Sequence, residues 1–300
     1  MKKAIWITAT VMVVSLLCTV CFGVALGSQG IREVLRDDGV LDNWSQTVAN
    51  WHDVVKHGEY LLDEIQEEEF LFDSQTVELP AADTLKITAE VGKVCVVRGT
   101  GDTVRAVLDQ FSVHTHPTSH FTLSSVGDTE LRLSAQSSLN GNSARLTVYI
   151  PKELSELTVE VETGEAELED VTADTITADV STGTVEVKRI TAKNVQLRVD
   201  TGNAEIDSSV RISETMNVHC ACGEVEFEMP VGGAKLVQYS VDTGNVDMDS
   251  KVRTDWIHSD TRKGASREGT LTYTRQETAA NGTYQIDVSI GNIEFDAEFD

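Results

Sequence analysis

Carboxylates recur at fixed places after a series of glycines, and this residue type is suited to binding cations. The residues three places after a glycine are Glu167, Glu186, Glu205, Glu226, Asp247 and Glu294. The residues five places after the same glycines are Glu169, Lys188, Asp207, Glu228, Asp249 and Asp296, so eleven of these twelve side chains are acidic. Hard oxygen ligands suit calcium, although the sequence has no EF-hand-like loop. The spacing therefore predicts an acidic strip that could hold divalent cations, with calcium as the candidate, or a basic partner.

The element that positions these carboxylates is a turn, as in the stretch VDTGNAEID at residues 199–207. The glycines of this turn and its counterparts are Gly92, Gly164, Gly183, Gly202, Gly223, Gly244 and Gly291. From Gly164 to Gly244 the steps are 19, 19, 21 and 21 residues. A nearly constant period of this length is typical of stacked structural repeats. Glycine is expected at the bend because a positive φ would be costly for a residue with a side chain.

Apolar residues alternate with polar ones on both sides of each glycine. The residues two and four places after a glycine are Ala166 and Leu168, Val185 and Val187, Ala204 and Ile206, Val225 and Phe227, Val246 and Met248, and Ile293 and Phe295. Leu157, Val159 and Val161 keep the same parity before Gly164. This alternation predicts strands with one face inward. We therefore expect an all-β fold, a β-solenoid over residues 76–300 whose rungs of about 19–21 residues stack directly on one another.

Stacking in register would bring like charges together along the acidic strip. Neighbouring carboxylates about 5 Å apart would repel by roughly 1 kcal/mol even at the dielectric constant of water. Three accounts of the strip stay open: a solvated face that discourages edge-to-edge aggregation, a cover formed by the insertion at residues 250–283, or a bound cation or basic partner. The basic residues of that insertion are Lys251, Arg253, Arg262, Lys263, Arg267 and Arg275.

The first 27 residues predict a membrane anchor. Ala4 to Leu26 is an uncharged stretch of 23 residues. As a helix it would reach about 35 Å, enough to cross a hydrocarbon core of roughly 30 Å. Lys2 and Lys3 would stay in the cytoplasm, which predicts a single-pass protein of a bacterial cell membrane with its C-terminal domain outside. The alternative is a signal peptide cleaved after the small-x-small sequence Ala25-Leu26-Gly27.

Residues 28–75 predict a helical stalk between the anchor and the β-domain. Val40, Trp44, Val48, Trp51 and Val55 recur at steps of 4, 4, 3 and 4 residues, which places them on one face of a helix. The stripe would pack on the next domain or on the membrane surface, or it would bind a partner. The formal net charge of −25 predicts that the protein does not bind nucleic acid.

Histidine and cysteine offer weaker candidates. The stretch HTHPTSH predicts a hairpin around Pro117, on which His114, His116 and His120 have a spacing that could hold zinc or are histidines of a polar hairpin. Cys220 and Cys222 share the inward parity and Cys95 does not, so we expect three unpaired thiols.

The segment ARLTVYIPKELSELTVEVETGEAEL, followed by repeated xVxTGxxxV units, resembles the putative-adhesin or toastrack family of bacterial envelope proteins. The resemblance covers residues 76–300. The sequence departs from it at Cys222, where four other rungs have Thr, and it lacks the second glycine of the family's GSGD turns. The resemblance implies a β-solenoid-like fold, a membrane anchor and an envelope location. Some members of the family are encoded near envelope-stress signalling systems. The resemblance implies no catalytic residues.

These observations together predict a non-catalytic structural, interaction or envelope-stress accessory module that contacts an envelope protein or polymer. No nucleophile elbow, P-loop, HExxH or Rossmann signature is present. We expect no cofactor apart from calcium on the acidic strip. Two alternatives stay open: an adhesin that binds host or wall polymers, and a carbohydrate-active enzyme built on a β-helix.

Overall fold

The computed structural model describes residues 70–113, 121–135, 142–229, 234–273 and 281–296. The predicted membrane anchor and all but the last six residues of the predicted stalk lie outside these residues. Among the described residues, we find no helix that has both the length and the apolar character needed to cross a membrane.

The described residues form a nearly all-β domain, as the alternation predicted. Its strands are β1 (Phe70–Pro80), β2 (Thr84–Arg98), β3 (Thr103–Ser112), β4 (Phe121–Val126), β5 (Glu130–Ala135), β6 (Asn142–Ile150), β7 (Leu154–Glu169), β8 (Thr172–Lys188), β9 (Thr191–Ile206), β10 (Arg211–Glu228), β11 (Ala234–Met248), β12 (Trp256–Lys263), β13 (Ser266–Tyr273) and β14 (Asn281–Asp296). The short helix α4 (Ser250–Asp255) separates β11 from β12. β1 thus begins six residues before the predicted start of the β-region.

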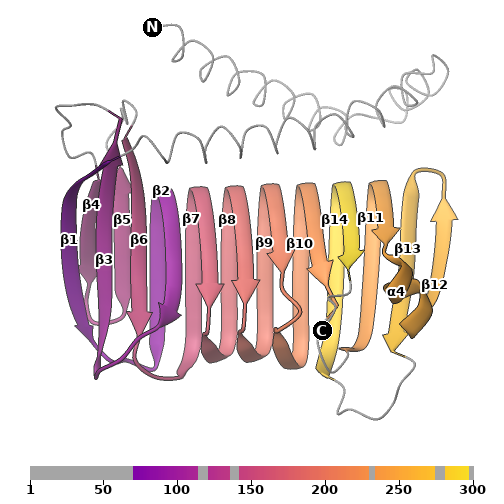
Figure 1. Cartoon of the computed structure of the whole chain (residues 1–300), viewed down its shortest axis with the longest axis horizontal. Coiled ribbons are helices and arrows are strands. Elements are labelled where there is room, and N and C mark those ends of the chain that lie inside the picture. Colours follow the sequence, from indigo (N-terminus) through magenta and orange to yellow (C-terminus); the bar gives the residue numbers. More distant parts are fainter. Residues whose placement is uncertain (1–69, 114–120, 136–141, 230–233, 274–280, 297–300) are drawn as a thin grey trace, which may run out of the picture. The chain divides into compact units, whose positions relative to one another are not determined.

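All the strands belong to one large, mostly parallel sheet (Figure 1). Its order is β1-β3-β6-β2-β7-β8-β9-β10-β14-β11-β13-β12, and β5 joins both β2 and β4. The pairs from β2 through β7, β8, β9, β10 and β14 to β11 are parallel, whereas the outer pairs β1–β3, β3–β6, β11–β13 and β12–β13 are antiparallel. β7, β8, β9, β10 and β14 therefore each lie between two long parallel strands.

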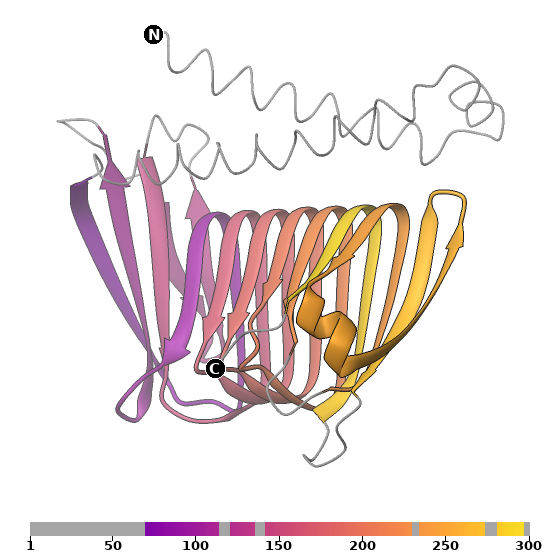
Figure 2. The ribbon, with the colours of Figure 1, turned by 45° about the vertical axis from the view of Figure 1, so that its right-hand side comes forward.

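The predicted alignment of the turn glycines is confirmed. Gly164 pairs with Gly183, and Gly183 pairs with Gly202. All seven predicted glycines have a positive φ, between 130° and 152°. Figure 2 shows the bends of successive strands lying one behind another. A Cβ built on Gly183 would lie 1.7 Å from the carbonyl oxygen of Gly164, so the close approach of the two backbones also requires glycine.

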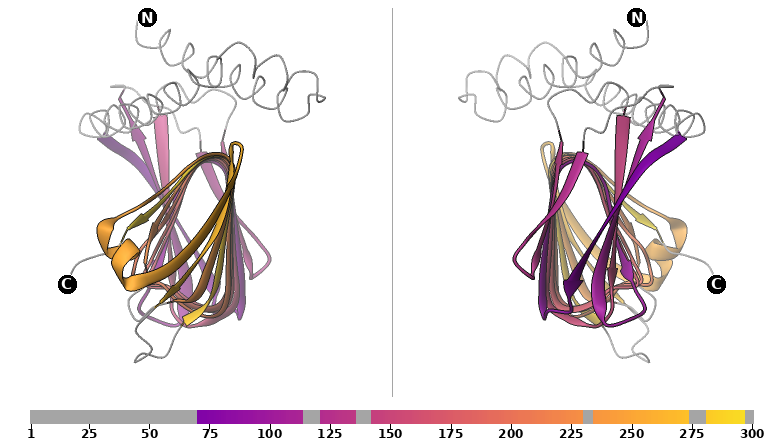
Figure 3. Two further views of the ribbon diagram at one scale, coloured as in Figure 1. Left: turned by 90° about the vertical axis from the view of Figure 1, so that its right-hand side faces the viewer. Right: turned by 90° about the vertical axis from the view of Figure 1, so that its left-hand side faces the viewer.

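Each of the strands β2, β7–β11 and β14 is divided into two arms by its bend (Figure 3), and the buried apolar side chains lie between these arms. The apolar residues two and four places after each glycine are buried, as predicted, and so are Leu157, Val159 and Val161 on the opposite arm. Larger rings fill the core toward the C-terminal end, where Phe227 makes edge-on contacts with Tyr284 and Phe295. No disulfide joins any of the cysteines in the described ranges.

The order of the strands differs from the order of the repeats in the sequence. Consecutive strands are neighbours from β7 to β10, but β14 then lies between β10 and β11. The chain leaves one strand position open after β10, forms β11 and the β12–β13 hairpin, and returns to fill that position. The predicted hairpin around Pro117 is wrong, because β3 and β4 on its two sides pair with other strands. His114, His116 and His120 lie outside the described residues.

Replacing Gly183 with alanine tests the close approach at the bend. Strain at a positive φ costs about 1–2 kcal/mol, and the overlap with the Gly164 carbonyl forces the two strands apart. We expect Gly183→Ala to lower the free energy of unfolding by more than about 4 kcal/mol, or to prevent folding. Gly101 has a similar φ of 114°, and a Cβ added there would meet no atom within 4 Å, so Gly101→Ala should cost only the strain. Equal losses in urea unfolding would contradict the account.

Candidate cation-binding strip

The structure brings the six predicted carboxylates into one column across neighbouring strands. The register pairs Glu167 with Glu186, Glu186 with Glu205, Glu205 with Glu226, Glu226 with Glu294, and Glu294 with Asp247. Adjacent strands lie about 4.8 Å apart, so each carboxylate has a like charge as its nearest neighbour on the column. Glu294 stands between Glu226 and Asp247 because β14 lies between β10 and β11.

One end of the strip carries its own counter-charge. Lys93, on β2, places its Nζ 2.7 Å from a carboxylate oxygen of Glu165 and 2.9 Å from one of Glu167. Lys188 forms a second ion pair with Glu186. Ligand oxygens of Glu165, Glu167 and Glu186 all lie within 4.8 Å of one another, close enough to share one metal ion. At this end, however, two lysines already contact the carboxylates.

The pKa values reflect this compensation. Burial opposes the charged form of Glu167, but the hydrogen bond and the charge of Lys93 outweigh it and hold the pKa of Glu167 below its ordinary value. Burial likewise opposes the charge on Lys93, yet the hydrogen bonds to Glu165 and Glu167 raise the pKa of Lys93 above its ordinary value. Lys93 and Glu167 thus stay charged and paired at neutral pH.

Cys95 borders the compensated end and is not a nucleophile. Its Sγ donates to a carboxylate oxygen of Glu167 at 3.4 Å. Burial raises the pKa of the Cys95 thiol to about 12, with the charge of Lys93 opposing that shift and Glu167 adding to it. A thiol protonated at neutral pH is a poor nucleophile and a poor metal ligand.

In the half of the strip formed by β10, β14 and β11, two carboxyl groups instead have raised pKa values. Partial burial raises the pKa of Glu226, and the neighbouring carboxylates of Glu294 and Asp296 raise it further. Burial, with the charges of Asp249 and Asp247, also raises the pKa of Asp296. Arg253 reaches an oxygen of Asp247 at 3.3 Å between exposed side chains, which screening makes weak. A cation would therefore relieve more repulsion at this end than at the end that holds Lys93.

The insertion at residues 250–283 reaches the strip where Arg253 contacts Asp247, but its β12–β13 hairpin extends the sheet and does not cover the strip, so the predicted cover is wrong for the hairpin. It forms α4, β12 and β13, and β13 extends the sheet by pairing with β11. Arg267 contacts Asp260 at 2.6 Å within the hairpin and donates to the backbone oxygen of Val246 at 2.7 Å. Because β13 pairs with β11 through the backbone, the β12–β13 hairpin continues the sheet beyond β11.

Two carboxylates five places after a glycine have structural roles instead. Asp249 caps α4 by accepting a hydrogen bond from the backbone N of Val252 at 2.7 Å. Asp207 accepts one from the backbone N of Ser209 at 2.8 Å in the turn after β9. Fewer carboxylates are therefore available as cation ligands than the sequence pattern indicated.

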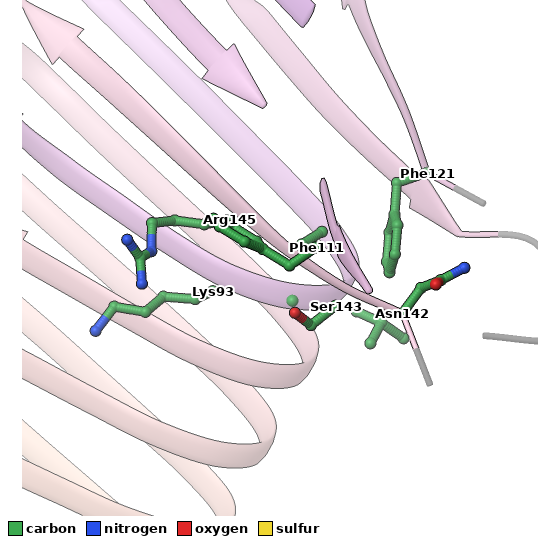
Figure 4. Close-up of a pocket in the computed structure, with 9 residues that line it drawn as sticks. Lys93, Phe111, Phe121, Asn142, Ser143 and Arg145 are labelled. Carbon is green, nitrogen blue, oxygen red and sulfur yellow. The ribbon is translucent and has the colours of Figure 1, made fainter. Parts of the chain in front are cut away.

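Sequence reasoning missed Lys93 and Glu165, the first residues after their glycines. The sequence contained a signal for this ion pair. Gly92 aligns with Gly164, and the residues directly after these glycines are basic and acidic, respectively. A shallow pocket begins beside Lys93, and Figure 4 shows Lys93 and Arg145 extending to one side of it, away from Phe121 and Asn142. Arg145 lies over the ring of Phe111, with its guanidinium carbon 5.6 Å from the ring centre. The acidic strip thus ends in a small basic region.

These features define a repeat domain in which parallel strands stack on an aligned column of glycines. The chain belongs to the Toastrack DUF4097 family, whose model matches residues 69–264. This confirms the resemblance drawn from the glycine-centred repeats. No curated protein matches the chain.

Several solved structures are similar to this chain at low sequence identity. A putative cell adhesion protein from Clostridium sporogenes is 12% identical, with a TM-score of 0.34 over 75% of this chain and 100% of its own. A putative adhesin from Bacteroides fragilis is 14% identical, with a TM-score of 0.38 over 74% of this chain and 97% of its own. A putative adhesin from Parabacteroides distasonis is 12% identical, with a TM-score of 0.24 over 74% and 97%.

Removing one charge at each end of the strip should change stability in opposite directions. The raised pKa of Glu226 means that its native state binds more protons than its unfolded state, so this group costs stability as pH rises above about 4. We expect Glu226→Gln to raise the free energy of unfolding at pH 7, by less than about 1 kcal/mol because the side chain is exposed. The gain should disappear below about pH 4.

Glu167→Gln is the matched control. The lowered pKa of Glu167 contributes stability above about pH 4 that is lost as pH falls, so this variant should be less stable than the wild type at pH 7. Urea unfolding at pH 4 and pH 7 measures both effects. A loss of stability in both variants at pH 7 would contradict the difference between the two ends.

Proposed function

We propose that this protein is a membrane-anchored, extracytoplasmic β-solenoid. It serves as a non-catalytic structural and interaction module of the bacterial cell envelope, and this role includes that of an accessory protein in the envelope-stress response. The observation that carries the proposal is the register of the strands. Residues that stand the same number of places from their turn glycines lie side by side on successive rungs. Such a stack presents regular outer columns that suit contact with another protein or a polymer. We assign no catalytic role, since Lys93 and Lys188 beside the strip are bonded to carboxylates and not placed to hold an anionic substrate.

The proposed location rests on residues 1–27, whose uncharged stretch follows Lys2 and Lys3. Cell fractionation should place the full chain in the membrane, extractable by detergent and not by salt. Protease added outside spheroplasts should digest the β-domain. Recovery of a mature chain that begins near residue 28 would replace the anchor with a cleaved signal peptide, and an intact β-domain inside protease-treated spheroplasts would refute export.

We further propose that the strip binds calcium, and that the half formed by β10, β14 and β11 contributes most. Carboxylates with raised pKa values gain more from a bound cation than carboxylates already paired with lysine. Extracellular calcium sites commonly have dissociation constants of about 0.1–1 mM. At about 5 mM calcium, a site of about 1 mM would add about 1 kcal/mol, or about 2–4 °C in Tm.

Calcium should therefore raise the Tm, and Glu226→Gln should reduce that rise more than Glu167→Gln does. Differential scanning calorimetry in calcium and in chelator measures the shift for the wild type and both variants. Magnesium at the same concentration is a control for screening of the net charge. Equal Tm values in calcium and chelator, or equal rises in calcium and magnesium, would remove the calcium proposal and leave the structural one standing.

Adhesion is the second candidate, and an outer column on the opposite arm favours it. Six places before Gly164 and before each later turn glycine stand neutral polar residues, namely Thr158, Thr177, Gln196, Asn217, Gln285 and Gln238 in the order of the sheet. Regular hydroxyl and amide groups on a flat sheet could bind a neutral polymer of the host or the wall. Retention of the β-domain on wall polymers, lost when Thr177 and Gln196 become glutamate, would establish this function in place of a purely structural one.

A further inference from the structure

The two ends of the sheet differ in how their edge strands are protected. At the N-terminal end the edge strands are β1 and β4, and side chains of β1 and β3 form hydrogen bonds with the backbone of β4. Gln110 accepts from the backbone N of Phe121 at 3.3 Å and donates to its oxygen at 3.4 Å, and Gln75 accepts from the backbone N of Leu123 at 3.3 Å. Such bonds occupy the groups that would otherwise pair with another chain.

At the C-terminal end, β12 is an open edge. Within the described part of the chain it pairs with β13 alone. All its residues after Trp256 are exposed, and Ile257 is 64% exposed. Figure 1 shows β12 as the last strand of the sheet. An edge strand whose backbone groups face solvent is a ready site for strand addition, and an exposed isoleucine on it favours a covered state.

The sequence of β12, WIHSDTRK, is complementary to itself in one antiparallel register. With Ser259 opposite Ser259 of a second copy, His258 lies opposite Asp260 and Trp256 lies opposite Arg262. A two-fold axis perpendicular to the sheet keeps each face continuous between the copies, so only registers that pair residues of equal parity are allowed. Of the two adjacent registers, one places Asp260 opposite itself, and a like-charge pair is destabilising. The other places His258 opposite itself, which loses the pairing of His258 with Asp260 and moves Ile257 from Thr261 to Ser259.

We propose that β12 is a dimerisation edge, at which two copies of this chain join their sheets antiparallel with Ser259 at the two-fold axis. Each Ile257 side chain is then covered next to Thr261 of the other copy, and on the Trp256 side of the ribbon Asp260 faces a hydrogen-bond donor in His258 while Arg262 faces the ring of Trp256. Asp260 keeps its contact with Arg267 within its own hairpin. The dimer forms one continuous sheet and needs neither calcium nor the membrane anchor.

Cysteine substitution tests the register directly. In this dimer the Cα atoms of the two Ser259 residues lie about 4.5–5.5 Å apart, within the range of a disulfide. Ser259→Cys in the full chain should therefore form a covalent dimer under mild oxidation. Thr261→Cys is the matched control, because the two Thr261 residues would lie about 13 Å apart. A mixture of Ile257→Cys and Thr261→Cys chains should crosslink, since these two positions face each other.

Light scattering on the full chain gives the second measurement. The wild type should be a dimer, and Ile257→Lys should weaken dimerisation at least tenfold without loss of folding, because its side chain is exposed in the single chain. Val126, 48% exposed on β4 at the other end, provides the control Val126→Lys, which should dimerise like the wild type. A monomeric wild type, or Ser259→Cys that crosslinks no better than Thr261→Cys, would overturn the proposal.

Discussion

The close approach of backbones at the glycine column is the constraint on which the rest of the structure depends. A Cβ at Gly183 would lie 1.7 Å from the carbonyl oxygen of Gly164, and one at Gly244 would lie 1.5 Å from that of Gly291. No side chain fits at these bends, and every bend takes a similar positive φ. Because the bends are aligned, residues at equal offsets from them are aligned as well. The inner columns therefore bury apolar side chains together, and the outer columns place like polar groups side by side.

This alignment places carboxylates next to one another, and their mutual repulsion is compensated to different extents along the acidic strip. Lys93 stands one residue after the first bend, and it forms ion pairs with two carboxylates of β7, the next strand in the sheet. Toward β10, β14 and β11 the pKa values of Glu226 and Asp296 are instead raised by burial and by neighbouring carboxylates. Stacking also provides the stability of the domain without covalent support, since the described cysteines form no disulfide. The interaction surfaces that we propose all depend on this stacking of strands along one direction.

The faces of the strands could be predicted from the sequence, whereas the order of the strands could not. Alternation is local, so the burial of Leu157 and the exposure of Glu226 follow from parity alone. The position of β14 between β10 and β11 depends on pairing between segments far apart in the sequence, for which the repeat spacing holds no signal. The same limit applies to the β12–β13 hairpin, because its basic residues suggested a charge-driven fold over the strip while backbone pairing with β11 decided its direction. Glu165 and Lys93 were missed because they stand at the first offset from their glycines, whereas the acidic pattern occupies offsets three and five.

The register across β10, β14 and β11 is the part of the stack that depends most on long-range pairing, and paired cysteines report on it directly. In the structure Glu226 is the neighbour of Glu294, and Asp247 lies one strand farther away. Neighbouring strands about 4.8 Å apart permit a disulfide, whereas twice that distance does not. The account predicts that a chain with Glu226→Cys and Glu294→Cys forms an internal disulfide under mild oxidation and that a chain with Glu226→Cys and Asp247→Cys does not. The reverse result would show that the rungs stack in the order of the sequence and would contradict the account.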